Sequence, residues 1–125
     1  MDIATIHQEA TAAAEQSAAD MLSKIGGDRM ACGFAWCEIF GIKLNTRQGR
    51  EFAKLGFRKG YGTGAPIELW NPSGSPVQNV DTKEAGARAY AEVFKRHGFE
   101  AYPNSRLERI LVMKSGSPTL WAASA

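Results

Sequence analysis

Apolar residues recur every three or four positions along the start of the chain, which is the period of an amphipathic α-helix. The stripe runs from Ile3 to Ile25, and Gly26 and Gly27 follow it as a helix-ending signal. The stripe is rich in alanine, so this helix can approach a neighbour closely although it gains little from burial alone. We expect it to pack on its own domain, with a homodimer through this helix as the alternative.

The segment 30–40 has the short length and the aromatic content of a β-strand. Strict alternation places Phe34, Trp36 and Phe40 on one face and small or aliphatic residues on the other. Because both faces are largely apolar, we expect this segment to be a central strand of a sheet.

Turn formers and capping residues divide the rest of the chain into short elements. Asn45 or Thr46 can cap a short helix that ends at Gly56. Closely spaced glycines between two β-like segments predict a hairpin, and a capping-box pattern predicts a later helix that ends at Gly98. The predicted elements are strands at 57–61 and 66–70, a helix that starts at Asp81 with Glu84 three residues on, and strands at 99–102 and 109–113.

Apart from the first helix, the order is strand, helix, strand, strand, helix, strand, which is the split βαβ or ferredoxin-like arrangement. We therefore predict an α+β domain with its helices on one face of the sheet. The N-terminal helix, residues 1–27, belongs to the same unit as an α+β core at 30–114, and residues 115–125 form a loosely ordered tail.

The composition is that of one ordinary globular domain. With 125 residues, 44% of them hydrophobic and 22% charged, the chain is long enough for a single core and needs no disulfide or metal to fold. It has no run of about 18 apolar residues and no signal-peptide pattern at its start. We therefore expect a cytoplasmic protein with no membrane partner.

The cysteines and histidines do not form a recognisable site. Cys32 and Cys37 lie five residues apart in a predicted strand, so their side chains fall on opposite faces and a bond between them is disfavoured. His7 and His97 have no further ligands at a spacing that suits zinc. We expect buried free thiols and no metal site.

Positive charge is concentrated in one part of the chain. Residues 43–59 hold six basic side chains against the single acid Glu51, a local net charge of +5 in a chain whose total is +2. Arg47, Arg50 and Lys54 are spaced three and four apart, so they share one face of the predicted helix. A basic stripe of this kind suits contacts with phosphates, and the alternative is a solvated helix face.

A glycine-rich loop follows this helix and extends the basic stripe. Arg58 and Lys59 precede Gly60-Tyr61-Gly62-Thr63-Gly64, whose amides and tyrosine can enclose an anion or stack on a base. The loop lacks the Gly-Lys-Ser/Thr ending of a P-loop. We predict a nucleic-acid or nucleotide-phosphate surface, with no cofactor, formed by Arg47, Arg50, Lys54, Arg58, Lys59 and Tyr61.

Two tryptophans, Trp36 and Trp70, fall in predicted strands. On a ferredoxin-like sheet, the face opposite the helices can carry aromatic side chains that stack on bases, as in RNA-recognition modules. The strand with Trp36 lacks the basic, glycine and aromatic run of those modules, and strand aromatics also pack in cores. Base stacking by these tryptophans is one interpretation, and core packing is the other.

Catalytic candidates are scattered along the chain. Ser105 and Arg106, next to a tyrosine and an asparagine, either line a polar pocket or belong to a simple turn. Glu38 and Glu68 fall in predicted strands, but their separation cannot be read from the sequence. A small enzyme with a pocket near Ser105 and Arg106 is therefore a lesser alternative to a binding protein.

Four segments resemble small proteins encoded by bacteriophages and other mobile elements, a group with no established activity. The resemblance transfers no catalytic or binding residue. It implies an accessory protein that acts by binding, either to nucleic acid or a nucleotide phosphate or, as an inhibitor, to a host factor such as a defence protein. The segments are CGFAW at Cys32–Trp36, LWNPSG at Leu69–Gly74, KEAGARAYAEVF at Lys83–Phe94 and GFEAYPNSRLE at Gly98–Glu108.

Overall fold

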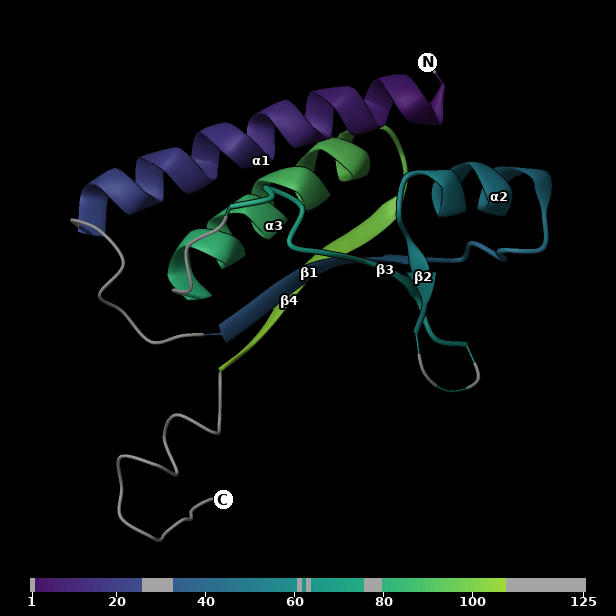
Figure 1. Ribbon diagram of the computed structural model, residues 1–125. Helices are drawn as coiled ribbons and strands as arrows, with labels where there is room; N and C mark the ends of the chain where they lie inside the picture. The colour runs from purple at the N-terminus through teal and green to yellow at the C-terminus, as the bar shows by residue number, and fades with distance from the viewer. Residues whose placement is uncertain (1, 26–32, 61, 63, 76–79, 108–125) are drawn as a thin grey trace, which may run out of the picture.

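The computed structural model describes residues 2–25, 33–60, 62, 64–75 and 80–107. In this part of the chain three helices lie with a four-stranded sheet, which confirms the predicted α+β class (Figure 1). In chain order the elements are α1 (Ile3–Ile25), β1 (Gly33–Phe40), α2 (Arg47–Lys54), β2 (Arg58–Lys59), β3 (Ile67–Trp70), α3 (Val80–Arg96) and β4 (Glu100–Leu107).

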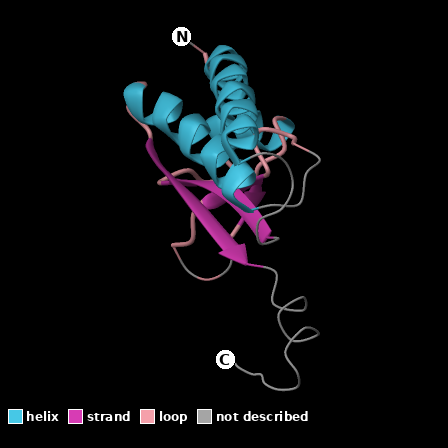
Figure 2. Ribbon diagram, turned by 90° about the vertical axis from the view of Figure 1, so that its left-hand side faces the viewer, coloured by secondary structure: helices cyan, strands magenta, loops and turns pink. Residues whose placement is uncertain are grey.

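The sheet has the strand order β2-β3-β1-β4, and every neighbouring pair is antiparallel. β1 lies between β3 and β4, which confirms its prediction as a central strand. Helices α1 and α3 lie together on one face of the sheet, with α3 next to the strands and α1 outside it (Figures 1 and 2). The other face has none of the described helices over it.

Small side chains let α3 lie close to β1. Gly33, Ala35, Cys37 and Ile39 form the buried face of β1. A Cβ atom on Gly33 would lie 2.8 Å from the Cβ of Val80, the first residue of α3, and 2.5 Å from a β4 backbone oxygen. This position therefore has no space for a side chain, because interiors are already close-packed.

α1 packs on α3 through its alanine stripe. Ala10, Ala14 and Ala18 are buried, and Ile3 and Ile6 join the same core as Tyr90 of α3. The stripe is thus in contact with the chain's own domain, as predicted.

The helical layer departs from a simple split βαβ arrangement. α2 has eight residues, about 12 Å of helix, and it lies beside the N-terminal end of α1 at one end of the sheet (Figure 1). Its buried Phe52 contacts the rings of Phe57, Phe94 and Phe99 at centroid distances of 5.1, 5.8 and 5.6 Å. The added helix α1, and not α2, therefore lies beside α3.

Two expectations for the second half of the chain are wrong. α3 begins at Val80, so Asp81 lies in its first turn, and Glu84 contacts Arg88 and accepts a hydrogen bond from Ser105 instead of closing a capping box. β4 continues to Leu107 because its backbone pairs with β1 along its whole length. The segment expected to be a turn or pocket wall is therefore a strand.

Some predictions fall partly or wholly outside the described residues. These are the strand at 109–113, the start of the strand at 30–40, the tail at 115–125, Cys32 and Tyr61. Of the strand expected at 57–61, the described residues form a strand at Arg58–Lys59, as β2.

A partly buried polar pair joins α1 to α3. The Tyr90 hydroxyl and His7 Nδ1 are 2.7 Å apart, and Thr11 Oγ1 lies 3.4 Å from the other ring nitrogen. Burial lowers the pKa of His7 and raises the pKa of Tyr90. Next to this pair, burial and the charge of Glu38 raise the pKa of the free Cys37 thiol to about 12, so the thiol stays protonated.

We expect the protein to lose stability as the pH falls below 6.5, the ordinary pKa of histidine. In that range the unfolded chain takes up a proton on His7 before the folded protein does, and stability falls wherever the unfolded state binds more protons. Glu9, whose pKa is also lowered, adds its own loss only below 4.5. Urea unfolding of the wild type and of His7→Gln between these two pH values should show a shallower pH dependence in the variant. An equal pH dependence of stability in the two proteins would contradict the attribution of this loss to His7.

Candidate functional site

Six exposed basic side chains lie on the loop after β1, on α2 and on β2. Thr46 caps α2: its Oγ1 accepts a hydrogen bond from the Gly49 amide at 3.0 Å and donates one to the Lys43 carbonyl at 2.6 Å. A Cβ on Gly49 would collide with that carbonyl, so the loop and the helix pack tightly. We call these six residues the basic surface: Lys43, Arg47, Arg50, Lys54, Arg58 and Lys59.

The basic surface forms no ion pair with any other described residue. Within the described residues no acid lies within 4.0 Å of any of the six cationic groups, and the ion pairs found there involve Arg88, Arg96 and His97. Arg50 donates to the Asn45 carbonyl oxygen at 3.2 Å. The basic surface therefore presents cations that are free to contact an anion.

A hollow of about 1050 Å³ adjoins the basic surface, between the loop after β1 and the β2–β3 hairpin. Lys43 and Lys59 line it together with Gly60, Gly62 and Gly64. A Cβ on Gly60 would lie 2.7 Å from the Pro66 carbonyl oxygen, and Gly62 and Gly64 have φ angles of +91° and +74°. Glycine is therefore required in this loop both for space and for backbone conformation.

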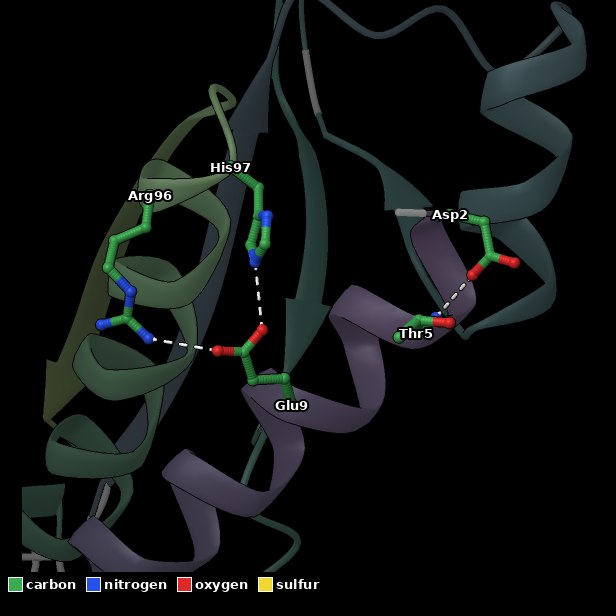
Figure 3. A network of polar contacts seen from close by, with 5 residues as sticks. All are labelled: Asp2, Thr5, Glu9, Arg96 and His97. Atoms are coloured by element: carbon green, nitrogen blue, oxygen red, sulfur yellow. Dashed lines mark hydrogen bonds and ion pairs between the residues drawn. The ribbon is translucent and has the colours of Figure 1, made fainter.

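A second hollow, of about 560 Å³, lies between α1, α2 and the end of α3. Asp2, Arg47, Glu51 and His97 line it, so charges of both signs meet there. Figure 3 shows His97 directed at Glu9 of α1, with Nε2 and Oε1 3.0 Å apart, and Arg96 on the same carboxylate at 3.5 Å. These contacts lower the pKa of Glu9. His97 is thus engaged in joining the two helices.

The sheet face opposite the helices carries aromatic and charged side chains, because the register brings alternate residues of three strands together. Trp36 pairs with Trp70 and Asn104, and Glu38 pairs with Glu68 and Tyr102. We call this surface the open face: Phe34, Trp36, Glu38 and Phe40 of β1, Glu68 and Trp70 of β3, and Tyr102, Asn104 and Arg106 of β4.

The two tryptophans stack on each other at the centre of the open face. Their ring centroids are 4.5 Å apart with an interplanar angle of 16°, and Phe34 meets Trp70 edge-on at 6.0 Å. Trp70 keeps 44% of its surface exposed and Tyr102 keeps 41%. This degree of exposure for large aromatic residues marks a candidate interaction surface.

Each tryptophan holds a glutamate in place. Trp36 Nε1 donates to Glu38 Oε2 at 2.9 Å, and Trp70 Nε1 donates to Glu68 Oε1 at 3.2 Å. Asn104 Nδ2 also donates to Glu38 Oε2, at 3.1 Å. The open face therefore has two carboxylates that accept hydrogen bonds from its indole rings.

The structure separates two residues that the sequence placed in one polar pocket. Ser105 donates to Glu84 on the helix side of β4, whereas Arg106 lies on the open face, 5.8 Å from the Phe34 ring centroid. The sequence pointed to Trp36 with Trp70 and to Glu38 with Glu68 as two separate pairs, but it did not bring the two pairs together. Only the pairing register of β1 with β3 could have shown that they are neighbours.

Two types of site are not found in the described part of the chain. It holds no group of three or more histidine, cysteine and acidic side chains that could bind a metal ion. None of its helices combines the length and the hydropathy needed to cross a membrane. Comparison of the chain with protein-family models, curated proteins and solved structures gives no match.

We expect the Trp36–Trp70 stack to contribute a measurable coupling energy. Trp36→Leu and Trp70→Leu should each lower the free energy of unfolding, and the double variant should lose less than the sum, with a coupling of about 0.5–1.5 kcal/mol. Urea unfolding of the four proteins measures it. Additive losses would mean that the rings do not interact in solution.

Proposed function

We propose that the protein binds nucleic acid, and that it does so through the phosphates and without reading the base sequence. The observation that carries this proposal is the basic surface, with six exposed cations on adjoining elements and no acid in ion-pair contact with them in the described residues. Lysine and arginine on such a surface release counterions from a polyanion when they replace them at the phosphates, which favours binding.

The placement of the cations suits a strand of phosphates. Arg47, Arg50 and Lys54 follow one another along a face of α2, and Lys43 and Lys59 line the glycine hollow beside it. Amides of a glycine-rich loop can add hydrogen bonds to phosphate oxygens. A free nucleotide phosphate offers the same chemistry on a smaller scale, so it is the alternative ligand for the hollow.

The open face is less suited to phosphates. Glu38 and Glu68 lie at its centre and would repel a phosphate chain that crossed the tryptophans. We therefore place the nucleic acid on the basic surface, and base stacking by Trp36 or Trp70 stays a prediction. Binding without sequence preference suits the accessory role implied by the resemblance to proteins of phages and mobile elements.

The experiment is fluorescence anisotropy with a labelled DNA duplex, repeated with single-stranded DNA, between about 50 and 200 mM salt. Affinity of the wild type should fall steeply with salt. Arg47→Ala combined with Arg50→Ala should weaken binding to any sequence and reduce the salt slope by about two, roughly one for each phosphate that the variant no longer neutralises.

The matched control is Arg88→Ala combined with Arg96→Ala, which removes the same charge from α3. It should bind almost as the wild type does. If both double variants lost the same affinity for DNA, net charge alone would explain the binding and the basic surface would have no special role. Absence of DNA binding by the wild type at low salt would overturn the proposal. Displacement of the duplex by a free nucleotide at micromolar concentration would favour the smaller ligand.

A further inference from the structure

The open face holds two like charges directly opposite each other. Glu38 of β1 and Glu68 of β3 are cross-strand partners in the antiparallel register, so their side chains project from the same face. Like charges in this position are unfavourable for the sheet. In the described residues no cation lies within 4.0 Å of either carboxylate. Even Arg58, the cross-strand partner of Glu68, makes no ion pair with it.

Both carboxylates accept hydrogen bonds but have no ion-pair partner in the described part of the chain. The indole N–H groups of Trp36 and Trp70 bind one oxygen of each glutamate. The second oxygens, Glu38 Oε1 and Glu68 Oε2, accept no hydrogen bond from the described residues. The arrangement therefore presents two negatively charged acceptors beside an indole that is 44% exposed.

Aromatic rings at the rim of this face already attract cations of the chain itself. Lys95 Nζ lies 4.8 Å from the ring centroid of Tyr102, and the Arg106 guanidinium lies 5.8 Å from that of Phe34. In the described residues no cation lies over Trp36 or Trp70. The two indoles are the strongest cation–π acceptors on the face, and none of the cations that the structure describes occupies them.

We propose that the open face is a docking surface for an arginine-bearing peptide segment of another protein. An arginine side chain would stack on the exposed Trp70 indole and donate to Glu38 and Glu68. Arginine fits better than lysine, because its planar guanidinium stacks on aromatic rings and offers several donors in one plane to carboxylates. The negative pair disfavours nucleic acid at this face, although the basic surface adjoins it at Arg58, the cross-strand partner of Glu68.

The partner lies on the face of the sheet and does not extend it. β4 is an edge strand, and Pro103 in its middle has no N–H to pair with an added strand. β2, the other edge, has only two residues. Side-chain recognition on the open face is therefore the mode of binding that the sheet favours.

The test is a titration of the ¹⁵N-labelled full chain with a blocked pentapeptide in which two arginines alternate with alanines. Signals of the Trp36 and Trp70 Nε1–H groups report binding directly. The arginine peptide should shift both signals, a lysine counterpart should bind more weakly, and a glutamate counterpart should not bind.

Glu38→Gln combined with Glu68→Gln should weaken the arginine peptide about tenfold or more, which corresponds to 1.4 kcal/mol. Each glutamine still offers an oxygen to its indole, and the variant loses a like-charge pair, so it should fold; thermal unfolding checks this. Two controls keep the open face intact. The first control, Glu15→Gln combined with Glu92→Gln, removes the same charge from α1 and α3. The second, Arg47→Ala combined with Arg50→Ala, alters only the basic surface. Both variants should bind the peptide as the wild type does.

The proposal would be overturned if the arginine peptide did not shift the indole signals. It would also be overturned if the peptide bound Glu38→Gln with Glu68→Gln as tightly as it bound Glu15→Gln with Glu92→Gln. Sedimentation of the protein alone tests the competing occupant. Self-association that disappears in Glu38→Gln combined with Glu68→Gln would show that the face binds a second copy of this chain. A loss of DNA binding in Arg47→Ala with Arg50→Ala tests only the basic surface, so the two proposals fail independently.

Discussion

The close approach of α3 to β1 on one side and to α1 on the other is the constraint on which the rest of the structure depends. Both contacts use small side chains: Gly33 and Ala35 on the strand, and the buried alanines of α1. Because the period of a strand is two residues, small residues toward α3 leave the large ones on the opposite face. The same alternation along β1 therefore packs α3 on one face of the sheet and places the aromatic residues on the open face.

Local patterns predicted the elements well where one physical signal dominates. The alternation in residues 33–40 and the stripe of α1 have clear periods, and the cap at Thr46 is satisfied locally by the Gly49 amide. β4 could not be predicted over its full length, since Pro103 and Asn104 are typical of turns and only pairing with β1 keeps them extended. The position of α2 also depends on tertiary packing, because Phe52 lies among rings that are distant in the sequence.

Of the two candidate surfaces, the sequence predicted the basic surface but not the open face. The face shared by Arg47, Arg50 and Lys54 follows from helical spacing alone, so the sequence was enough to group them. The groups on the open face come from three strands, and a shift of one residue in register would send the same side chains to the other face. The like-charge pair of Glu38 and Glu68 is therefore a property of the sheet, which no spacing within one segment could reveal.

The absence of space at Gly33 has a consequence for how this protein can change over generations. A larger residue on the inner face of β1 would push α3 away from the sheet, and overpacking of this kind is costly. Substitutions on the outer face, where Trp70 and Tyr102 are partly exposed, meet solvent instead of a packed neighbour. The binding preference of the outer face can therefore diverge between descendants of this chain while the packing of α3 on β1 stays the same.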